Sequence, residues 1–366
     1  RSLSFLIGID DPINQYLMRH PEFLFDNSFE SALINPSNSY IIKAHLLAAA
    51  WEHPLSGADA AIFGDWFAKE VGEMEEQGLL RKKRGRWHIS PQLANPTDSI
   101  NIRSASRQNY TLVDVASGAT LETVDESVAF LQIHPDAIYL HQGDSYLVTE
   151  LDIPSRVAYV KKTDVNYYTQ PKDHTDLKVI RKLKSRRVGG TDVHLGEVEI
   201  TLRVLGYKKK RQFSEEIIGE VPLSLPPWRF NTIALWFDLP LELAREVENK
   251  GLDLAGGLHA LEHASIGILP LLALCDRNDI GGVSTLLNAD TGRGAVFIYD
   301  AYPGGVGISE QGYKKLEELW RLVFKTISEC PCDSGCPSCI QSYKCGNNNQ
   351  PLDKKAALQL CQELLC

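Results

Sequence analysis

A cluster of cysteines near the carboxyl end constrains this chain more than any other feature. Five of its eight cysteines fall within the sixteen residues from Cys330 to Cys345. Four thiolates can bind one tetrahedral zinc ion where the chain folds back sharply, and Pro331, Gly335 and Pro337 supply turns. The spacing therefore predicts a structural zinc site. Its predicted ligands are Cys330, Cys332, Cys336 and Cys339.

Other interpretations of the cluster remain open at this point. Cys345 is a spare thiol that could replace Cys330 or Cys332 as a ligand. Four cysteines also bind iron–sulfur clusters, and thiols can stay free or form disulfides. Tight clustering in a chain without a leader favours a metal in a reducing compartment. Four protein ligands leave no open coordination position, so we expect the metal to be structural and its loss to unfold the tail.

Length and hydropathy bound the architecture. A chain of 366 residues predicts two or three domains. The longest apolar stretch, Ile266–Leu274, is interrupted by Gly267 and Pro270, so we expect no membrane span. The first residues lack a cationic leader, and the missing initial Met predicts a longer parent protein. We expect a cytoplasmic protein close to the bacterial nucleoid, or a nuclear one in a eukaryote.

Charge is segregated along the chain. The net charge is −9, yet between Arg156 and Arg211 there are 15 lysines and arginines against 6 acidic residues. A second basic cluster, Arg81–Arg86, comes just before Trp87. On an acidic protein such clusters indicate local surfaces that face a polyanion, although a solvated charged face has the same composition.

The first hundred residues predict helices followed by a basic hairpin. Ser2–Ile9 alternates like a strand, and Asp11 precedes Pro12 as the cap of a helix. Helical periodicity predicts helices over Tyr40–Glu52 and Ile62–Gln77. Leu79–Ile89 then has the pattern of two short strands joined by a basic turn. This order is typical of a winged helix.

The middle of the chain, from Ile100 to Leu239, predicts a β-rich domain with a barrel or sandwich. The predicted strands are Tyr110–Val115, Val128–Ile133, Ala137–His141, Tyr146–Glu150, Arg156–Val160, Val198–Leu205 and Thr232–Phe237. Helical periodicity then returns from Leu241. The elements predicted after it are a buried helix over Leu258–Cys275, a strand over Ala295–Asp300, and amphipathic helices over Ser309–Glu329 and Asp353–Leu365.

A second motif reads His259-Ala-Leu-Glu262-His263. Its two histidines share one helix face, as in the inverted zinc-protease pattern, which would make the chain a metal-dependent hydrolase. The alternative is a polar pair inside the fold, bonded to Asp300 or Tyr299.

A third motif, Tyr299–Ser309, is a glycine-rich turn between a strand and a helix. Backbone amides at such a turn can hold an anion. Its spacing matches neither dinucleotide nor Walker A motifs, so we expect a structural turn. No D-E-x-H box occurs either, and we expect no ATP hydrolysis by this chain alone.

The three motifs together resemble a known family. His259–His263, Tyr299–Ser309 and Cys330–Gln341 are similar to the C-terminal zinc-binding domain of mitomycin repair factor A-type superfamily 2 helicases, relatives of the RecQ-four-like helicases. Ser2–Ile9 resembles the strand after the last motor motif of the second RecA-like lobe, and Tyr40–Ile89 the family's winged helix. The resemblance spans nearly the whole chain.

The resemblance implies an ATP-dependent 3′→5′ DNA helicase acting in DNA repair, with ATP and Mg²⁺ bound by motor lobes upstream of Arg1. It assigns structural Zn²⁺ to the four cysteines predicted above. The implied fold is α+β and multidomain: the end of a RecA-like lobe over 1–39, a winged helix over 40–95, a β-rich, barrel-like domain over 96–240, and an α/β zinc-binding domain over 241–366.

We therefore expect an accessory region that guides single-stranded or forked DNA beside the upstream RecA-like motor lobes. The rivals are the metal-dependent hydrolase and a protein-interaction module whose basic runs are only solvated. The residues predicted to contact DNA are Arg81, Lys82, Lys83, Arg84, Arg86 and Trp87 on the wing, then Arg186, Arg187, Lys208, Lys209, Lys210 and Arg211 in the β-rich domain.

Overall fold

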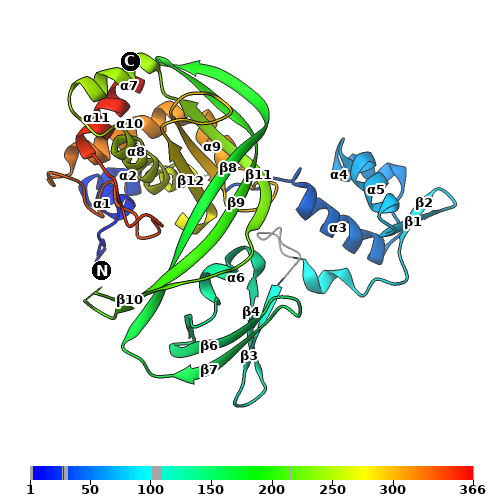
Figure 1. Cartoon of the computed structure of the whole chain (residues 1–366). Coiled ribbons are helices and arrows are strands. Elements are labelled where there is room, and N and C mark those ends of the chain that lie inside the picture. Colours follow the sequence, from blue (N-terminus) through cyan, green and yellow to red (C-terminus); the bar gives the residue numbers. More distant parts are fainter. Residues whose placement is uncertain (1–2, 27, 29–31, 101–108, 215, 366) are drawn as a thin grey trace.

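The computed structural model describes residues 3–26, 28, 32–100, 109–214 and 216–365 (Figure 1). Its first element is helix α1 (Pro12–Arg19), whose N-cap Asp11 accepts a hydrogen bond from the Asn14 amide at 2.7 Å. Helix α2 (Pro21–Asp26) follows. The strand predicted over Ser2–Ile9 is wrong for the described residues 3–9, which lie in no sheet. A strand is stable only beside a partner that accepts and donates its backbone hydrogen bonds, and here it has none.

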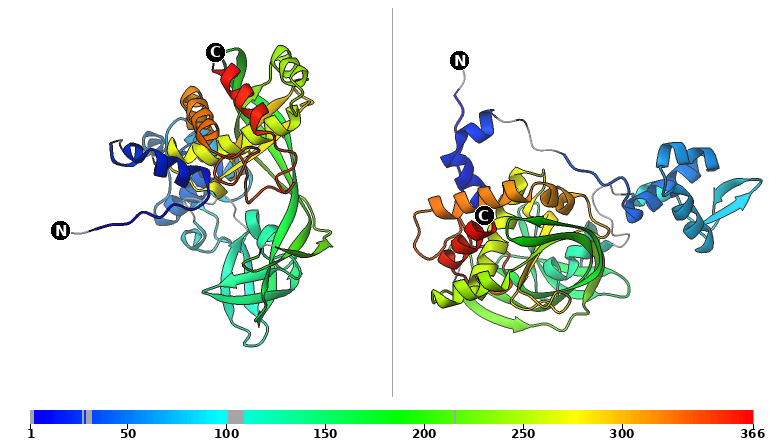
Figure 2. Two further views of the ribbon diagram at one scale, coloured as in Figure 1. Left: turned by 90° about the vertical axis from the view of Figure 1, so that its left-hand side faces the viewer. Right: turned by 90° about the horizontal axis from the view of Figure 1, so that it is seen from above.

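The winged helix forms a small unit with its own core, set apart from the rest of the molecule (Figure 2). The predicted helix over Ile62–Gln77 is broken, because Gly64 has a left-handed φ of 86°. Leu55 pairs with Trp87 and adds a third short strand to the hairpin. The elements of this unit are α3 (Ser39–Glu52), α4 (Ala60–Phe63), α5 (Phe67–Glu76), β1 (Leu80–Lys83) and β2 (Arg86–Ile89).

A five-stranded sheet follows, in the order β4-β3-β7-β6-β5. The strand predicted over Val128–Ile133 is wrong, because this segment forms helix α6 (Glu126–Gln132). Asp125 caps helix α6, and the apolar side chains of the helix pack on the sheet. A short apolar run has the same sequence pattern in a buried helix as in a buried strand, so the sequence did not distinguish the two. The strands are β3 (Asn109–Asp114), β4 (Thr120–Asp125), β5 (Ile138–His141), β6 (Asp144–Asp152) and β7 (Val157–Thr163).

Two very long strands dominate the second sheet, which has the order β10-β9-β11-β13-β12 with β8 paired to β9. β8 (Tyr167–Val188) and β9 (Thr191–Arg211) form a curled ribbon of 22 and 21 residues that runs the length of the molecule (Figure 1). This sheet takes strands from both sides of residue 240. Its other strands are β10 (Ile217–Pro222), β11 (Trp228–Asp238), β12 (Ile280–Thr285) and β13 (Ala295–Asp300).

Helices cover one face of this sheet and enclose the main hydrophobic core. α8 (Leu254–Ile268) is buried almost all round, as predicted, but it ends at Ile268 because Pro270 follows in a 3₁₀ turn. The other helices are α7 (Leu241–Asn249), α9 (Ile308–Lys314), α10 (Leu316–Glu329) and α11 (Lys354–Leu364). None of the described helices combines the length and the hydropathy that crossing a bilayer requires. The winged helix, curled sheet and cysteine-rich region confirm the predicted α+β multidomain class.

Candidate metal centre and nucleic-acid interface

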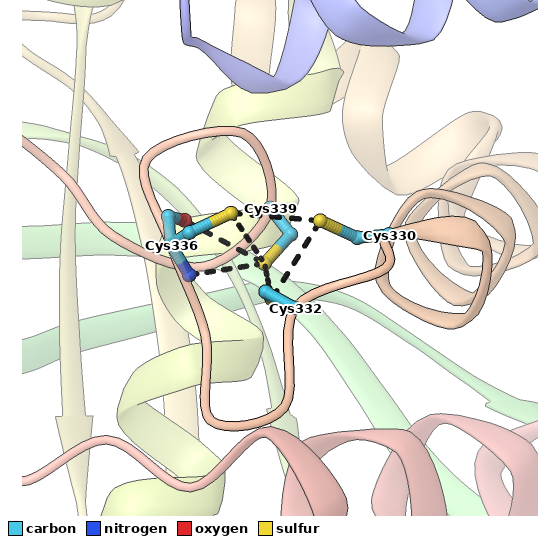
Figure 3. Close-up of side chains that lie close together, drawn as sticks. All are labelled: Cys330, Cys332, Cys336 and Cys339. Atoms are coloured by element: carbon cyan, nitrogen blue, oxygen red, sulfur yellow. Dashed lines mark hydrogen bonds between the residues drawn. The ribbon is translucent and has the colours of Figure 1, made fainter.

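The structure brings the four predicted cysteines together in one loop between α10 and α11 (Figure 3). Their sulfurs lie 3.5 to 3.8 Å apart along the four edges Cys330–Cys332, Cys330–Cys336, Cys332–Cys339 and Cys336–Cys339. Four sulfurs placed about 2.3 Å from one zinc ion would be separated by about 3.8 Å. The cluster therefore has the size of a tetrahedral thiolate site.

Local turns and one lysine hold this loop in shape. Gly335 has a φ of 109°, a left-handed conformation that favours glycine. The buried Lys354, the first residue of α11, donates from Nζ to the carbonyl oxygens of Cys330 at 2.7 Å and Cys332 at 2.6 Å. It also lies 3.4 Å from the Cys332 sulfur. Sequence reasoning missed Lys354, because only the fold places α11 under the loop.

The thiols of Cys330 and Cys339 differ in acidity. Burial raises the pKa of Cys339, and its neighbouring thiols add to that rise. At Cys330 burial acts in the same direction, but hydrogen bonds from the Cys332 backbone and the surrounding thiols outweigh it and lower the pKa to about 7. One thiol of the cluster is thus poised to lose its proton near neutral pH, as thiolate ligation requires.

Cys345 lies with the histidine motif rather than with the other four cysteines. Its sulfur is 3.5 Å from Nε2 of His259, and its ligand atom and those of His259 and His263 lie within 4.8 Å of one another. In the described part of the chain, neither histidine is hydrogen-bonded to Asp300 or Tyr299. Their Nδ1 atoms instead face backbone carbonyls of the cysteine-rich loop.

The hydrolase interpretation lacks a catalytic glutamate at this cluster. Glu262 is buried, and this burial raises its pKa. Its hydrogen bonds are made with Ser284 on β12. A general base must lie within hydrogen-bond reach of a metal-bound water, and the bonds of Glu262 are committed elsewhere.

The glycine-rich turn binds an anion that belongs to the chain itself. The Asp300 carboxylate accepts backbone hydrogen bonds from Val306, Gly307, Ile308 and Ser309 at 2.6 to 3.3 Å, and one from the Ser309 hydroxyl. These amides are therefore unavailable to a nucleotide phosphate, in agreement with the structural turn predicted.

The wing presents its cations to solvent. Arg81, Lys82, Lys83, Arg84 and Arg86 are all exposed on the β1–β2 hairpin. Among the described residues, Arg81, Lys83 and Arg84 have no ion-pair partner. A row of cations without carboxylates has the chemistry that nucleic-acid phosphates recognise.

Trp87 is committed to the winged-helix core. Its indole Nε1 donates to Glu75 at 2.9 Å, and its ring packs edge-on against Phe67. The Lys82 ammonium lies 4.4 Å from the ring centroid. Trp87 therefore packs the hairpin on the helices, and its stacking on a base stays a prediction.

The predicted cations of the β-rich region are mostly engaged with the protein. Arg186 donates to the Tyr313 carbonyl at 2.7 Å, and Arg187 to that of Gly190 at 3.1 Å. Lys208 is 8% exposed, and Lys209 lies over the Tyr167 ring. Lys210 is half-buried, and Arg211 pairs with Glu216 at 3.1 Å. Lys178, Lys182 and Lys184 on β8 are exposed cations that sequence reasoning did not single out, because β8 was not predicted.

Two family models match the chain. The MrfA Zn-binding domain matches residues 261–340, and the winged helix domain of the ATP-dependent helicase HRQ1 matches residues 34–105. The first match contains all four cysteines of the metal cluster and ends before the loop that follows them. The second match contains the basic hairpin.

Curated relatives and solved structures agree with these matches. An "uncharacterized ATP-dependent helicase", YprA of Bacillus subtilis, is 35% identical over 93% of this chain and 45% of its own length. The ATP-dependent helicase HRQ1 of Saccharomyces cerevisiae is 27% identical over 97% of this chain and 34% of its own. The crystal structure of the DUF1998 helicase MrfA bound to DNA superposes with a TM-score of 0.53 and 33% identity, over 96% of this chain and 46% of MrfA.

The chain thus spans less than half the length of the curated helicases it matches. Within that span, the winged helix and the cysteine-rich domain occur in the order that the sequence resemblance predicted. Over these two segments the chain is similar to the MrfA Zn-binding domain and to the winged helix domain of the HRQ1 helicase.

Proposed function

We propose that this chain is the DNA-guiding, zinc-binding accessory region of an ATP-dependent 3′→5′ DNA helicase that acts in DNA repair. The observation that carries this proposal is the row of unpaired cations, Arg81, Lys83 and Arg84, on the winged-helix hairpin. The DNA-bound state of the related MrfA supports it, as do the names of the helicase relatives. ATP and Mg²⁺ would be used by RecA-like motor lobes elsewhere in the protein.

The wing cations would act on the phosphates of single-stranded or forked DNA. Each phosphate contact releases condensed counterions, which makes affinity fall as salt rises. Such contacts position a strand without selecting its sequence, as a translocating helicase requires. Lys82 and Arg86 would add charge at the same surface, although Lys82 also lies over Trp87, and Arg86 contacts His53 at 3.1 Å.

The four-cysteine cluster would bind one structural Zn²⁺. Its sulfur spacing and the four-thiolate donor set fit zinc, and the matching family model is described as zinc-binding. Four protein ligands saturate the ion, so it would stabilise the loop between α10 and α11 and take no part in a reaction.

Residues 1–39 would complete a RecA-like lobe. The support is the exposure of apolar side chains in the extended segment: Leu3, Phe5 and Ile7 are 79%, 82% and 85% exposed. An alternating apolar segment of this kind is suited to pair with a neighbouring strand. The boundaries at residues 40, 96 and 241 stay proposals that rest on the sequence resemblance, and the second sheet, with strands on both sides of residue 240, gives no support to the last of them.

The test of the proposal is the salt dependence of single-stranded DNA binding, measured by fluorescence anisotropy. Replacing Arg81, Lys83 and Arg84 together by alanine should weaken binding and reduce the slope of log affinity against log salt by about 0.7 for each lost contact. A control variant changes three cations away from the wing instead, with the same loss of charge: Lys315 at the N-cap of α10, Arg321 on α10 and Lys355 on α11.

An unchanged slope in the wing variant would remove the wing from the DNA path. Equal effects of the two variants would mean that net charge alone governs binding. No salt-dependent affinity in the wild-type chain would favour the protein-interaction module, in which the basic runs are only solvated.

A further inference from the structure

A second group of metal-ligating side chains lies where α8 meets the loop that follows the four-cysteine cluster. His259 and His263 are one turn apart on α8, with ring centroids 4.3 Å apart. Cys345 approaches from the loop, its sulfur 3.5 Å from His259 Nε2. A zinc ion with nitrogen at about 2.0 Å and sulfur at about 2.3 Å would hold these two atoms about 3.5 Å apart. We infer that His259, His263 and Cys345 bind a second zinc ion, with one position left for water.

Backbone carbonyls orient both imidazoles for this role. Nδ1 of His259 lies 2.8 Å from the Pro351 carbonyl oxygen, and Nδ1 of His263 lies 2.9 Å from that of Ile340. A carbonyl only accepts, so each Nδ1 carries the proton, and each neutral ring has its lone pair on Nε2. Protein ligands of zinc are commonly held this way, by a hydrogen bond from the nitrogen that does not bind the metal.

The two rings cannot readily be protonated together. Their ring centroids are 4.3 Å apart, and two positive charges at that distance would repel each other. Within this group, the Cys345 sulfur and His259 Nε2 contact each other at 3.5 Å. A cation between the three ligand atoms would accept one lone pair from each of them.

Hydrogen bonds within the loop hold the sulfur of Cys345 in position. The Asn349 backbone amide donates to that sulfur at 3.2 Å. The Asn349 side chain closes the loop, accepting from the Ser342 amide at 2.8 Å and donating to its carbonyl at 3.1 Å. The four-cysteine cluster contains a similar bond from a backbone amide to a sulfur, since the Cys336 amide donates to the sulfur of Cys339 at 3.4 Å.

The donor set indicates the metal and its role. Two imidazoles and one thiolate suit zinc, whereas magnesium and calcium prefer oxygen ligands. Glu262 is bonded to Ser284, so the site lacks the carboxylate base of the hydrolase pattern. A metal here would join α8 to the loop, and that loop reaches the curled ribbon, because Gln170 Nε2 on β8 donates to the Tyr343 carbonyl at 2.9 Å. The second zinc would thus tie helix, loop and ribbon together.

The test is the zinc content of the purified chain, after equilibration with Zn²⁺ alone and removal of loose metal on a chelating resin. We expect Cys345→Ala and His259→Gln each to hold one zinc fewer per chain than the wild type. Cys275→Ala, which changes a cysteine of neither cluster, should match the wild type. Because the signal is a difference of one zinc, it does not depend on what the four-cysteine cluster binds or on whether the wing contacts DNA.

Zinc-edge X-ray absorption adds a readout that folding defects do not mimic. Nitrogen scatterers should be present in the wild type and absent in both variants, which retain sulfur ligation. His259 is only half-buried, so His259→Gln should keep its circular dichroism spectrum even where Cys345→Ala does not. Equal zinc content in wild type and His259→Gln, or a wild-type spectrum without nitrogen, would overturn the proposal and leave a thiol–imidazole hydrogen bond in its place.

Discussion

At the scale of single residues, short-range spacing was the most informative signal. The four cysteines predicted from Pro and Gly turns lie within one loop, because ten residues with fixed turns can arrange their sulfurs with little help from the rest of the fold. Cys345 was harder to assign. Its partner His259 is 86 residues away, so only tertiary contacts could separate it from the neighbouring cysteines.

Glu310 is a residue whose burial predicts a pH effect. It lies on the first turn of α9, with its Oε2 buried and, in the described structure, without a hydrogen-bond partner. Burial and the nearby Asp300 raise the pKa of Glu310 from 4.5 to about 7, against smaller opposing effects of Lys314 and Lys184. The folded state therefore binds this proton more tightly than the unfolded state. Stability should fall as pH rises from 4.5 to about 7.

Replacing Glu310 by Gln should remove that loss. We expect Glu310→Gln to raise the urea midpoint relative to wild type at pH 8 and to change it little at pH 4.5. Glu318→Gln changes an exposed carboxylate on α10 that pairs with Lys315, and it serves as the control. A midpoint difference that is the same at both pH values would show that Glu310 does not titrate in this range.

At the scale of elements, helices were predicted better than strands. Apolar periodicity and capping residues act locally, and both are visible at α1 and α3. The long ribbon strand β8 alternates exposed charged residues with half-buried ones, and few of its side chains are apolar. Its stability comes from pairing with β9 along its whole length, which no local pattern reveals.

Asn38 joins two elements, and its replacement should weaken both. Its Oδ1 caps α3 through the amides of Tyr40 at 2.9 Å and Ile41 at 3.4 Å. Its Nδ2 donates to the carbonyls of Pro303 at 3.0 Å and Gly305 at 2.7 Å in the glycine-rich turn. Asn38→Ala should lower the free energy of unfolding by about 2 kcal/mol, since a lost cap alone costs about 1 kcal/mol and buried carbonyls lose donors.

Asn38→Ser separates the two contributions. Serine restores the helix cap but cannot reach the turn, so it should recover about 1 kcal/mol in urea unfolding. Full recovery in Asn38→Ser would mean that the bonds to Pro303 and Gly305 contribute nothing measurable.

At the scale of the whole molecule, separate cores predict separate responses to metal loss. Cys330, Cys339 and Ile340 belong to the main core, together with α8, α10 and α11. The winged helix has its own core around Leu46, Phe67 and Met74. Removing zinc with a strong chelator should therefore loosen the tail and leave the winged helix folded, because binding energy at a structural site is folding energy.

Hydrogen exchange followed by mass spectrometry measures this directly. Amides in 330–364 should lose protection in the metal-free chain, whereas those in 39–89 should exchange at the wild-type rate. Restoring zinc to the same sample controls for irreversible damage. Unchanged protection in 330–364 would contradict a structural role for the metal, and loss in 39–89 would contradict the independence of the two cores.

The sequence by itself determined the winged helix, the four-cysteine loop and the basic hairpin, because each depends on spacings within a few tens of residues. The tertiary structure decided which of the predicted DNA-contacting residues have protein partners, since Arg186, Arg211 and Trp87 find partners that are distant or unrecognisable in the sequence. It also brought Cys345 beside His259 and Lys354 under the zinc loop. Burial and partner geometry exist only in the packed chain. They decide whether a basic side chain is solvated or bound to the protein, and whether a thiol such as Cys345 has a neighbour with which it could bind a metal.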